Sequence, residues 1–104
     1  MTDRLVVVGG DAAGMSAASQ ARRLRDAGDL DIVVLEQGPD VSYSACGIPY
    51  WVGDYVADRD ALLARMPHWF AERDITVHLG TRAAAVDLDA GVVTAADGRR
   101  FPYD

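Results

Sequence analysis

The side chain of this chain best suited to covalent chemistry is that of Cys46, its only cysteine, in the segment S-Y-S-A-C-G-I-P-Y at 42–50. A thiol exchanges with disulfides once it is deprotonated, because the thiolate is the reactive species. We expect residues 46–52 to form a short helix, whose free N–H groups and dipole would favour the thiolate. The alternative is that Cys46 is a small buried apolar side chain, the commonest state of a lone cysteine. Metal chemistry is not indicated, because Cys46, His68 and His78 lack the paired spacing of a zinc site.

A glycine-rich turn, G-G-D-A-A-G at 9–14, follows the apolar run 5–8. Glycines permit a tight turn and a close approach of the backbone to a pyrophosphate, and the helix that follows offers free N–H groups to phosphates. The dinucleotide fingerprint is G-x-G-x-x-G, so Asp11 stands where the middle glycine is expected. Asp11 could instead cap the N-terminus of the helix. The alternative is a tight turn between strand and helix that binds no ligand.

The elements that would position this turn form a strand–helix–strand unit. The apolar runs 5–8 and 32–35 predict parallel strands buried on both faces, and residues 11–27 predict a helix between them. We expect Gly28 to end the helix as its C-cap. The apolar face of the helix is predicted to hold Ala13, Ala17, Ala21 and Leu24, with Ala18 beside it. Glu36 closes the second strand, where an acid can hydrogen-bond a ribose hydroxyl; alternatively it is an ordinary solvated acid.

The second half of the chain predicts a different arrangement. Helices are expected over 58–65 and 67–73, followed by a third strand over 75–79. The short apolar runs 85–88, 92–95 and 100–101 are separated by turn signals at Asp89–Gly91 and Asp97–Gly98. This pattern is typical of a small antiparallel meander. The fold class is therefore α/β, with a Rossmann-like βαβ unit and an appended antiparallel meander.

Composition and charge limit the classes of partner. Of 104 residues, 50% are hydrophobic and 25% are charged, as in an ordinary globular protein, and the formal net charge is −6. An acidic surface disfavours nucleic acid and anionic membranes as partners. No apolar run approaches the roughly 18 residues that span a bilayer, and the N-terminus lacks a signal-peptide pattern. We expect a cytoplasmic protein.

The chain resembles the flavin-dependent pyridine nucleotide–disulfide oxidoreductases, and within them the single-cysteine branch of coenzyme A disulfide reductases, NADH oxidases and peroxidases, and persulfide reductases. The resemblance spans essentially the whole chain and is carried by V-V-V-G-G-D-A-A-G-M-S-A-A, S-Q-A-R-R-L, V-V-L-E, S-Y-S-A-C-G-I-P-Y and D-G-R-R-F-P-Y-D. This family often replaces the middle glycine, which accounts for Asp11. The resemblance implies that residues 1–104 are the N-terminal segment of a split FAD-binding domain. The resemblance further implies that the family's NAD(P)-binding and dimerisation domains are absent from these residues, so we expect this segment alone to be inactive.

The resemblance also implies a mechanism and a set of site residues. NAD(P)H would pass electrons through FAD to a redox-active Cys46, in a protein expected to be a homodimer. Cofactor contacts are implied for Gly9, Gly10, Asp11, Ala12, Ala13, Gly14, Glu36, Gln37 and Ala83. Contacts to a small thiol or disulfide substrate such as coenzyme A are implied for Ser16, Gln20, Arg23, Ser42 and Arg73.

Two other functions stay open beside coenzyme A disulfide reduction. Coenzyme A disulfide reductases often carry Asn immediately before the cysteine, where this chain has Ala45. That departure favours an NADH oxidase or peroxidase that cycles through a sulfenic acid at Cys46. The third possibility is a free-standing nucleotide-binding redox module without turnover.

Overall fold

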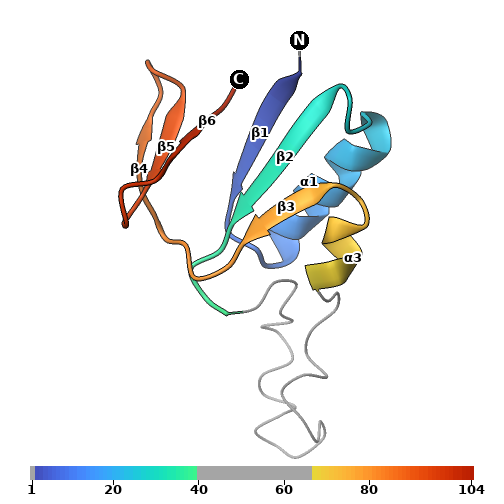
Figure 1. Cartoon of the computed structure of the whole chain (residues 1–104), viewed down its shortest axis with the longest axis horizontal. Helices are drawn as coiled ribbons and strands as arrows, with labels where there is room; N and C mark the ends of the chain where they lie inside the picture. The colour runs from blue at the N-terminus through green and yellow to red at the C-terminus, as the bar shows by residue number, and fades with distance from the viewer. Residues whose placement is uncertain (1, 40–66) are drawn as a thin grey trace, which may run out of the picture.

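The computed structural model of this chain describes residues 2–39 and 67–104. Their elements, in chain order, are β1 (Asp3–Val8), α1 (Ala12–Leu24), β2 (Leu30–Leu35), α3 (Pro67–Ala71), β3 (Ile75–His78), β4 (Ala83–Asp87), β5 (Val92–Ala95) and β6 (Arg100–Pro102) (Figure 1). Outside the described residues lie the predictions made for the helices over 46–52 and 58–65, for Ser42 and for Cys46.

The first three strands form a parallel sheet in the order β1-β2-β3. β1 and β2 pair in register from Asp3 with Leu30 to Val8 with Leu35, and α1 connects them. The predicted βαβ unit is therefore confirmed, with each strand beginning two residues earlier than expected. β2 is central because its apolar residues are buried on both faces: Ile32 and Val34 face one hydrophobic cluster, and Val33 and Leu35 face another.

Helix α1 packs on the parallel sheet with only part of the predicted face: Ala18 and Ala21 lie in or against the core, as does Met15, which was not predicted. Met15 and Ala18 are its buried residues, whereas Ala13 and Ala17 are exposed and Leu24 is 73% exposed. Alanine is small enough to be tolerated on either face, so a row of alanines does not identify the packed side. The larger Met15 side chain fills the space against β1, β2 and Phe70 of α3.

The end of α1 also differs from the prediction. The helix ends at Leu24, and Arg25 is its C-cap in an extended conformation, so the prediction of Gly28 as C-cap is wrong. The guanidinium of Arg22 supplies the reason. Its Nη1 donates to the carbonyls of Arg25 and Leu30, at 3.2 and 2.8 Å. These bonds fix the chain where it leaves the helix and tie it to the start of β2, while the N–H of Arg25 donates to the carbonyl of Ala21 at 2.9 Å, so the exit needs no glycine.

The predicted antiparallel meander is confirmed as a second sheet in the order β4-β5-β6. The β4–β5 turn is closed by Asp87, whose Oδ1 accepts from the N–H groups of Asp89 and Ala90, at 3.1 and 3.0 Å. The β5–β6 turn contains Gly98, which has a φ of 93°, a conformation that favours glycine.

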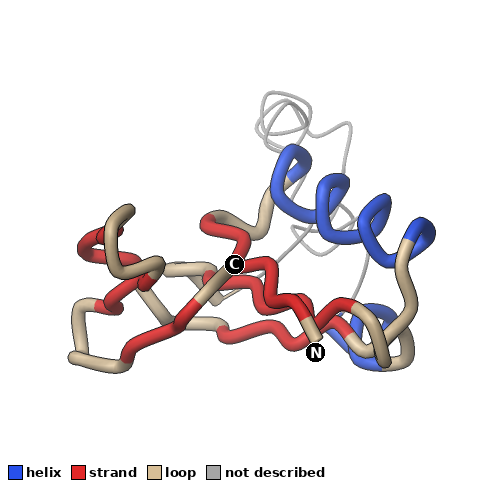
Figure 2. The backbone as a smooth tube through the Cα atoms, turned by 90° about the horizontal axis from the view of Figure 1, so that it is seen from above, coloured by secondary structure: helices blue, strands red, loops and turns tan. Residues whose placement is uncertain are grey.

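The described residues form three layers (Figures 1 and 2). Helices α1 and α3 cover one face of the parallel sheet. The meander covers the other face through Val93, Ala95 and Phe101, which pack against Val33 and Leu35 of β2. No helix within this described part is long and apolar enough to cross a membrane.

Candidate cofactor site

The glycine turn between β1 and α1 can be built only with glycine at its critical positions. Gly9 has a φ of 100°, and its N–H donates to the carbonyl of Leu35 at 2.8 Å, which ties the turn to the end of β2. A Cβ on Gly14 would lie 1.8 Å from the carbonyl oxygen of Gly9. The first turn of α1 therefore touches the backbone of the loop, and the cradle is as tight as a pyrophosphate site requires.

Asp11 occupies the N-cap position of α1, as one alternative predicted, but its carboxylate does not act as a cap. Its backbone is extended, with a φ of −89°, its side chain makes no capping hydrogen bond, and its carbonyl accepts from the N–H of Met15 at 2.9 Å. The side chains of Asp11, Ala12 and Ala13 are exposed. The start of α1 is thus left open, with small side chains at the first two helical positions.

The carboxylate of Glu36 is in direct contact with the glycine turn. Its Oε1 accepts from the N–H of Gly10 at 2.8 Å, and its Oε2 accepts from the N–H of Gly38 at 2.6 Å. The side chain is half-buried, and Gln37 beside it is exposed. Each carboxylate oxygen keeps a further lone pair for another donor. The arrangement can therefore hold a ribose hydroxyl beside the loop that would hold a phosphate.

The connection between β3 and β4 lies against the end of β2. The N–H of Gly80 donates to the carbonyl of Gly38 at 3.0 Å, and the N–H of Thr81 donates to the carbonyl of Glu36 at 2.8 Å. Thr81 is 2% exposed, and its hydroxyl donates to the carbonyl of Leu79 at 3.1 Å. Ala83, predicted as a cofactor contact, starts β4 two residues later and is half-buried.

Arg99, which the sequence did not indicate as a site residue, reaches this connection from the meander. Its Nη2 donates to the hydroxyl of Thr81 at 2.8 Å, and its Nε donates to Asp97 Oδ2 at 2.8 Å. The hydrogen bonds from Arg99 hold the pKa of Asp97 below its usual range. The only sequence signal was the position of Arg99 after the turn residues Asp97–Gly98.

The substrate residues predicted on α1 share one exposed face. Ser16, Gln20 and Arg23 are spaced by four and three residues, so they lie along one side of the helix, and all three are exposed. Nη1 of Arg23 donates to Oε1 of Gln20 at 3.2 Å. This face is distinct from the one that packs on the sheet.

Arg73, the other predicted substrate residue in the described part, follows α3. Its guanidinium lies 3.7 Å from the centre of the Trp69 ring and donates to the Trp69 carbonyl at 2.9 Å. Nε of Arg22 donates to the carbonyl of Arg73 at 2.9 Å, so the backbone of Arg73 lies next to the C-terminal turn of α1. Ser42 and Cys46 lie outside the described residues, so their relation to this surface is not given by the structure.

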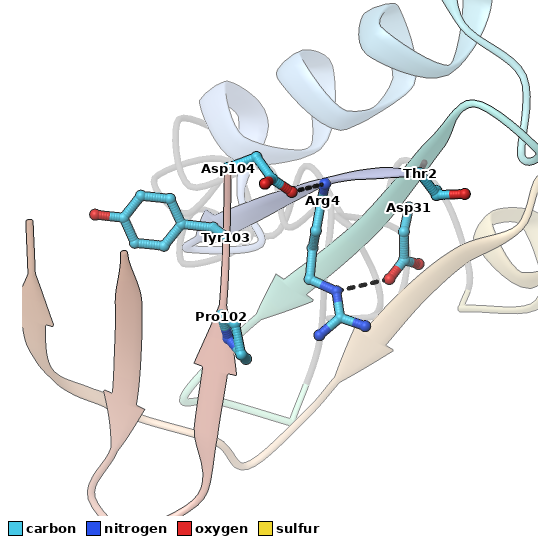
Figure 3. A pocket seen from close by; sticks show the side chains of 6 residues that line it. All are labelled: Thr2, Arg4, Asp31, Pro102, Tyr103 and Asp104. Carbon is cyan, nitrogen blue, oxygen red and sulfur yellow. Dashed lines mark hydrogen bonds and ion pairs between the residues drawn. The ribbon is translucent and has the colours of Figure 1, made fainter. Parts of the chain in front are cut away.

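A groove of about 290 Å³ lies at the opposite end of the parallel sheet (Figure 3). Nε of Arg4 is 2.7 Å from Asp31 Oδ2, and the N–H of Arg4 donates to Asp104 Oδ2 at 2.7 Å. Both contacts lie at the amino ends of β1 and β2, whereas the glycine turn and Glu36 lie at their carboxyl ends. Among the described residues, those that line this groove are Thr2, Arg4, Asp31, Pro102, Tyr103 and Asp104, and none of them was predicted as a cofactor or substrate residue.

Comparison with known proteins agrees with this geometry. The sequence profile of the family described as pyridine nucleotide-disulphide oxidoreductase matches residues 3–104, so this chain belongs to that family. A coenzyme A disulfide reductase of Staphylococcus aureus is 38% identical over 92 residues, which are 88% of this chain and 20% of that protein. The family resemblance inferred from the sequence motifs is confirmed.

Two solved structures resemble the fold closely. A NAD-dependent persulfide reductase from A. fulgidus has a TM-score of 0.87 at 35% identity, covering 97% of this chain and 20% of that one. A water-forming NADH oxidase from Lactobacillus brevis has a TM-score of 0.88 at 27% identity, covering 99% of this chain and 24% of that one. The α/β fold prediction is confirmed, and the chain spans about a fifth to a quarter of the length of these relatives.

Proposed function

We propose that this chain is the N-terminal segment of a split FAD-binding domain, in an oxidoreductase that passes electrons from NAD(P)H through FAD to Cys46. The substrate we propose is coenzyme A disulfide or a related disulfide or persulfide. The observation that carries the cofactor assignment is the pair of hydrogen bonds from Gly10 and Gly38 to the carboxylate of Glu36. A phosphate cradle and a ribose-binding acid in contact form the adenosine half of a dinucleotide site.

The residues of the glycine turn fit the charged part of such a cofactor. The pyrophosphate would lie against the backbone of Gly9–Gly14, where the positive end of the α1 dipole and the free N–H groups favour an anion. Glu36 would accept from the ribose hydroxyls with its remaining lone pairs. The carboxylate of Asp11 is exposed and makes no capping bond, so it leaves the N–H groups at the start of α1 available to an anion. Gln37, next to Glu36 in the chain, and Ala83, at the start of β4, would be further contacts to the adenosine.

The substrate assignment rests on the exposed surface of α1 and on the thiol. The guanidinium groups of Arg23 and Arg73 suit the phosphates of coenzyme A, and Ser16, Gln20 and Ser42 offer further hydrogen bonds. The Cys46 thiolate would attack one sulfur of the disulfide, forming a mixed disulfide and releasing the other half as a thiolate. Bound FAD would supply the two-electron relay from NAD(P)H that reduces the mixed disulfide. The identity to the S. aureus coenzyme A disulfide reductase supports this choice.

A second candidate is an NADH oxidase or peroxidase. It is supported by Ala45, which removes an amide expected beside the cysteine of a coenzyme A reductase, and by the similarity to the L. brevis NADH oxidase. In that reaction the Cys46 thiolate would attack one oxygen of hydrogen peroxide, breaking the O–O bond, becoming a sulfenic acid and releasing the other oxygen as water once protonated; two electrons from NAD(P)H through bound FAD would return it to the thiolate. The cofactor site would be the same, so only the electron acceptor separates the two candidates.

The test is to purify the natural protein that carries this sequence and assay it with NADH or NADPH. We expect a flavin absorbance spectrum and faster turnover with coenzyme A disulfide than with oxygen or hydrogen peroxide. Faster turnover with oxygen or peroxide would instead support the second candidate. Replacing Cys46 by serine should abolish turnover and leave the flavin spectrum in place. A colourless protein that cannot be reconstituted with FAD would contradict the proposal, and flavin binding without any turnover would favour a redox module.

A further inference from the structure

We infer that Arg99 is a positioning residue for the adenosine half of the cofactor site, although it lies in the β5–β6 turn and outside the glycine turn. The inference rests on the proposed function. Arg99 Nη2 donates to the hydroxyl of Thr81 at 2.8 Å, and these residues are 18 positions apart in the chain. The bond joins the meander to the connection that leads from β3 past Glu36.

Thr81 transmits this contact to Glu36 through its own backbone. Its side chain is buried, and the hydroxyl uses its donor on the carbonyl of Leu79 and its acceptor on Arg99. Its N–H donates to the carbonyl of Glu36 at 2.8 Å. Arg99 is therefore two hydrogen bonds away from the backbone of the residue whose carboxylate meets the glycine turn.

The guanidinium of Arg99 is itself held in place. Its Nε donates to Asp97 Oδ2 at 2.8 Å, its N–H donates to Asp97 Oδ1 at 3.0 Å, and its carbonyl accepts from the N–H of Ala95 at 2.8 Å. The guanidinium carbon lies 5.8 Å from the centre of the Phe101 ring. A planar, preorganised guanidinium loses less entropy for each hydrogen bond than a free side chain would. The held guanidinium can thus fix the position of the Thr81 hydroxyl.

The connection is in this way held from both of its sides. On the side of the parallel sheet, Gly80 and Thr81 are bonded to Gly38 and Glu36. On the side of the meander, Arg99 bonds to Thr81, and the N–H of Ala96 donates to the carbonyl of Arg82 at 2.8 Å. Ala83 begins where this connection ends. Without Arg99 the Thr81 hydroxyl would lose its donor, and the spacing between Glu36 and Ala83 would relax.

The experiment compares Arg99→Met with Arg100→Met in the natural protein that carries this sequence, after removal of flavin. Arg100 is the neighbouring arginine, is exposed on β6, and undergoes the same change of charge. FAD and ADP are the probes, because ADP contains the adenosine half alone. Dissociation constants are measured under conditions in which each apoprotein variant is fully folded, so that a change in global stability does not alter them.

We expect Arg99→Met to raise the dissociation constants of FAD and of ADP by about tenfold, which is the size of effect that losing a hydrogen bond to a charged group has. Arg100→Met should leave both affinities within about twofold. Arg99→Lys should restore part of the loss. Thr81→Val should also weaken the binding of FAD and ADP. Adding Arg99→Met to Thr81→Val should have little further effect, because both substitutions remove the same hydrogen bond between Arg99 and Thr81. If Arg99→Met does not fold, the ADP affinity of Thr81→Val tests the same hydrogen bond.

Unchanged affinity of Arg99→Met for FAD and ADP, with only a lower melting temperature, would overturn the inference and leave the proposed function intact. So would additive losses in the double variant. If the unsubstituted protein binds neither FAD nor ADP, the result contradicts the proposed function and, with it, this inference. The two failures are therefore distinguishable.

Discussion

Glu36 Oε1 accepts a hydrogen bond from the N–H of Gly10 at 2.8 Å, so two residues 26 positions apart meet at one edge of the parallel sheet. The carboxyl ends of adjacent parallel strands lie side by side, which places the turn after β1 next to the residue after β2. The second oxygen accepts from Gly38 at 2.6 Å and fixes the orientation of the carboxylate. The acid and the glycine turn therefore act as one unit.

Replacing Glu36 by glutamine should weaken FAD binding by about tenfold or more, because the amide NH₂ would face one of the two N–H donors. The control is Glu72→Gln, at the only other glutamate of the chain, whose side chain is 69% exposed. Equilibrium titration of the apoprotein with FAD measures the effect. Equal affinities of the two variants would contradict the role of Glu36.

Replacing Gly14 by alanine should disrupt the glycine turn, because the new Cβ would lie 1.8 Å from the backbone oxygen of Gly9 and one of the two segments must move. We expect loss of FAD binding and a lower midpoint of unfolding in urea. Gly28→Ala is the matched control, since its Cβ would meet nothing closer than 3.6 Å. That variant should keep FAD affinity and be as stable as the original chain or slightly more so.

Arg22 should contribute more to stability than its neighbours on α1. Its guanidinium donates to the carbonyls of Arg73, Asp74 and Leu30, at 2.9, 2.8 and 2.8 Å, and so joins α1 to the starts of β2 and β3. We expect Arg22→Met to lower the free energy of unfolding by about 2 kcal/mol. Arg23→Met, which removes a bond to an exposed glutamine, should change it by less than about 0.5 kcal/mol. Similar losses in both variants, measured by urea unfolding, would contradict this assignment.

The ion pair between Asp97 and Arg99 should make stability depend on pH in the acid range. Arg99 lowers the pKa of Asp97 in the folded chain, so the stabilisation is fully present above the ordinary aspartate pKa of about 4. It is lost as the pH falls from there through the lower folded pKa. The stability difference between the unsubstituted chain and Asp97→Asn should therefore shrink below about pH 4. A difference that stays constant across this range, or that persists unchanged in an Arg99→Met background, would count against the prediction.

Much of the fold followed from local patterns in the sequence. The uninterrupted apolar run 32–35 required burial on both faces, and β2 is indeed the central strand between the helices and the meander. The turn at Gly9–Gly14 and the strand-end acid Glu36 were predicted as cofactor residues, and the structure places them in contact. Turn signals at Asp89–Gly91 and Asp97–Gly98 correctly located the meander, because glycines with positive φ have few alternatives.

The sequence by itself determined which segments become strands, helices and tight turns, since those depend on neighbouring residues and on backbone sterics. Tertiary structure alone decided which face of α1 is buried, because alanines fit on either side and only the sheet selects Met15 and Ala18. It also decided the end of α1, where Arg22 binds carbonyls at the starts of β2 and β3 and the chain leaves the helix at Arg25, before the expected glycine cap. The contact of Arg99 with Thr81 belongs to the same class, because it forms only when the meander folds onto the sheet and no local pattern encodes that distance.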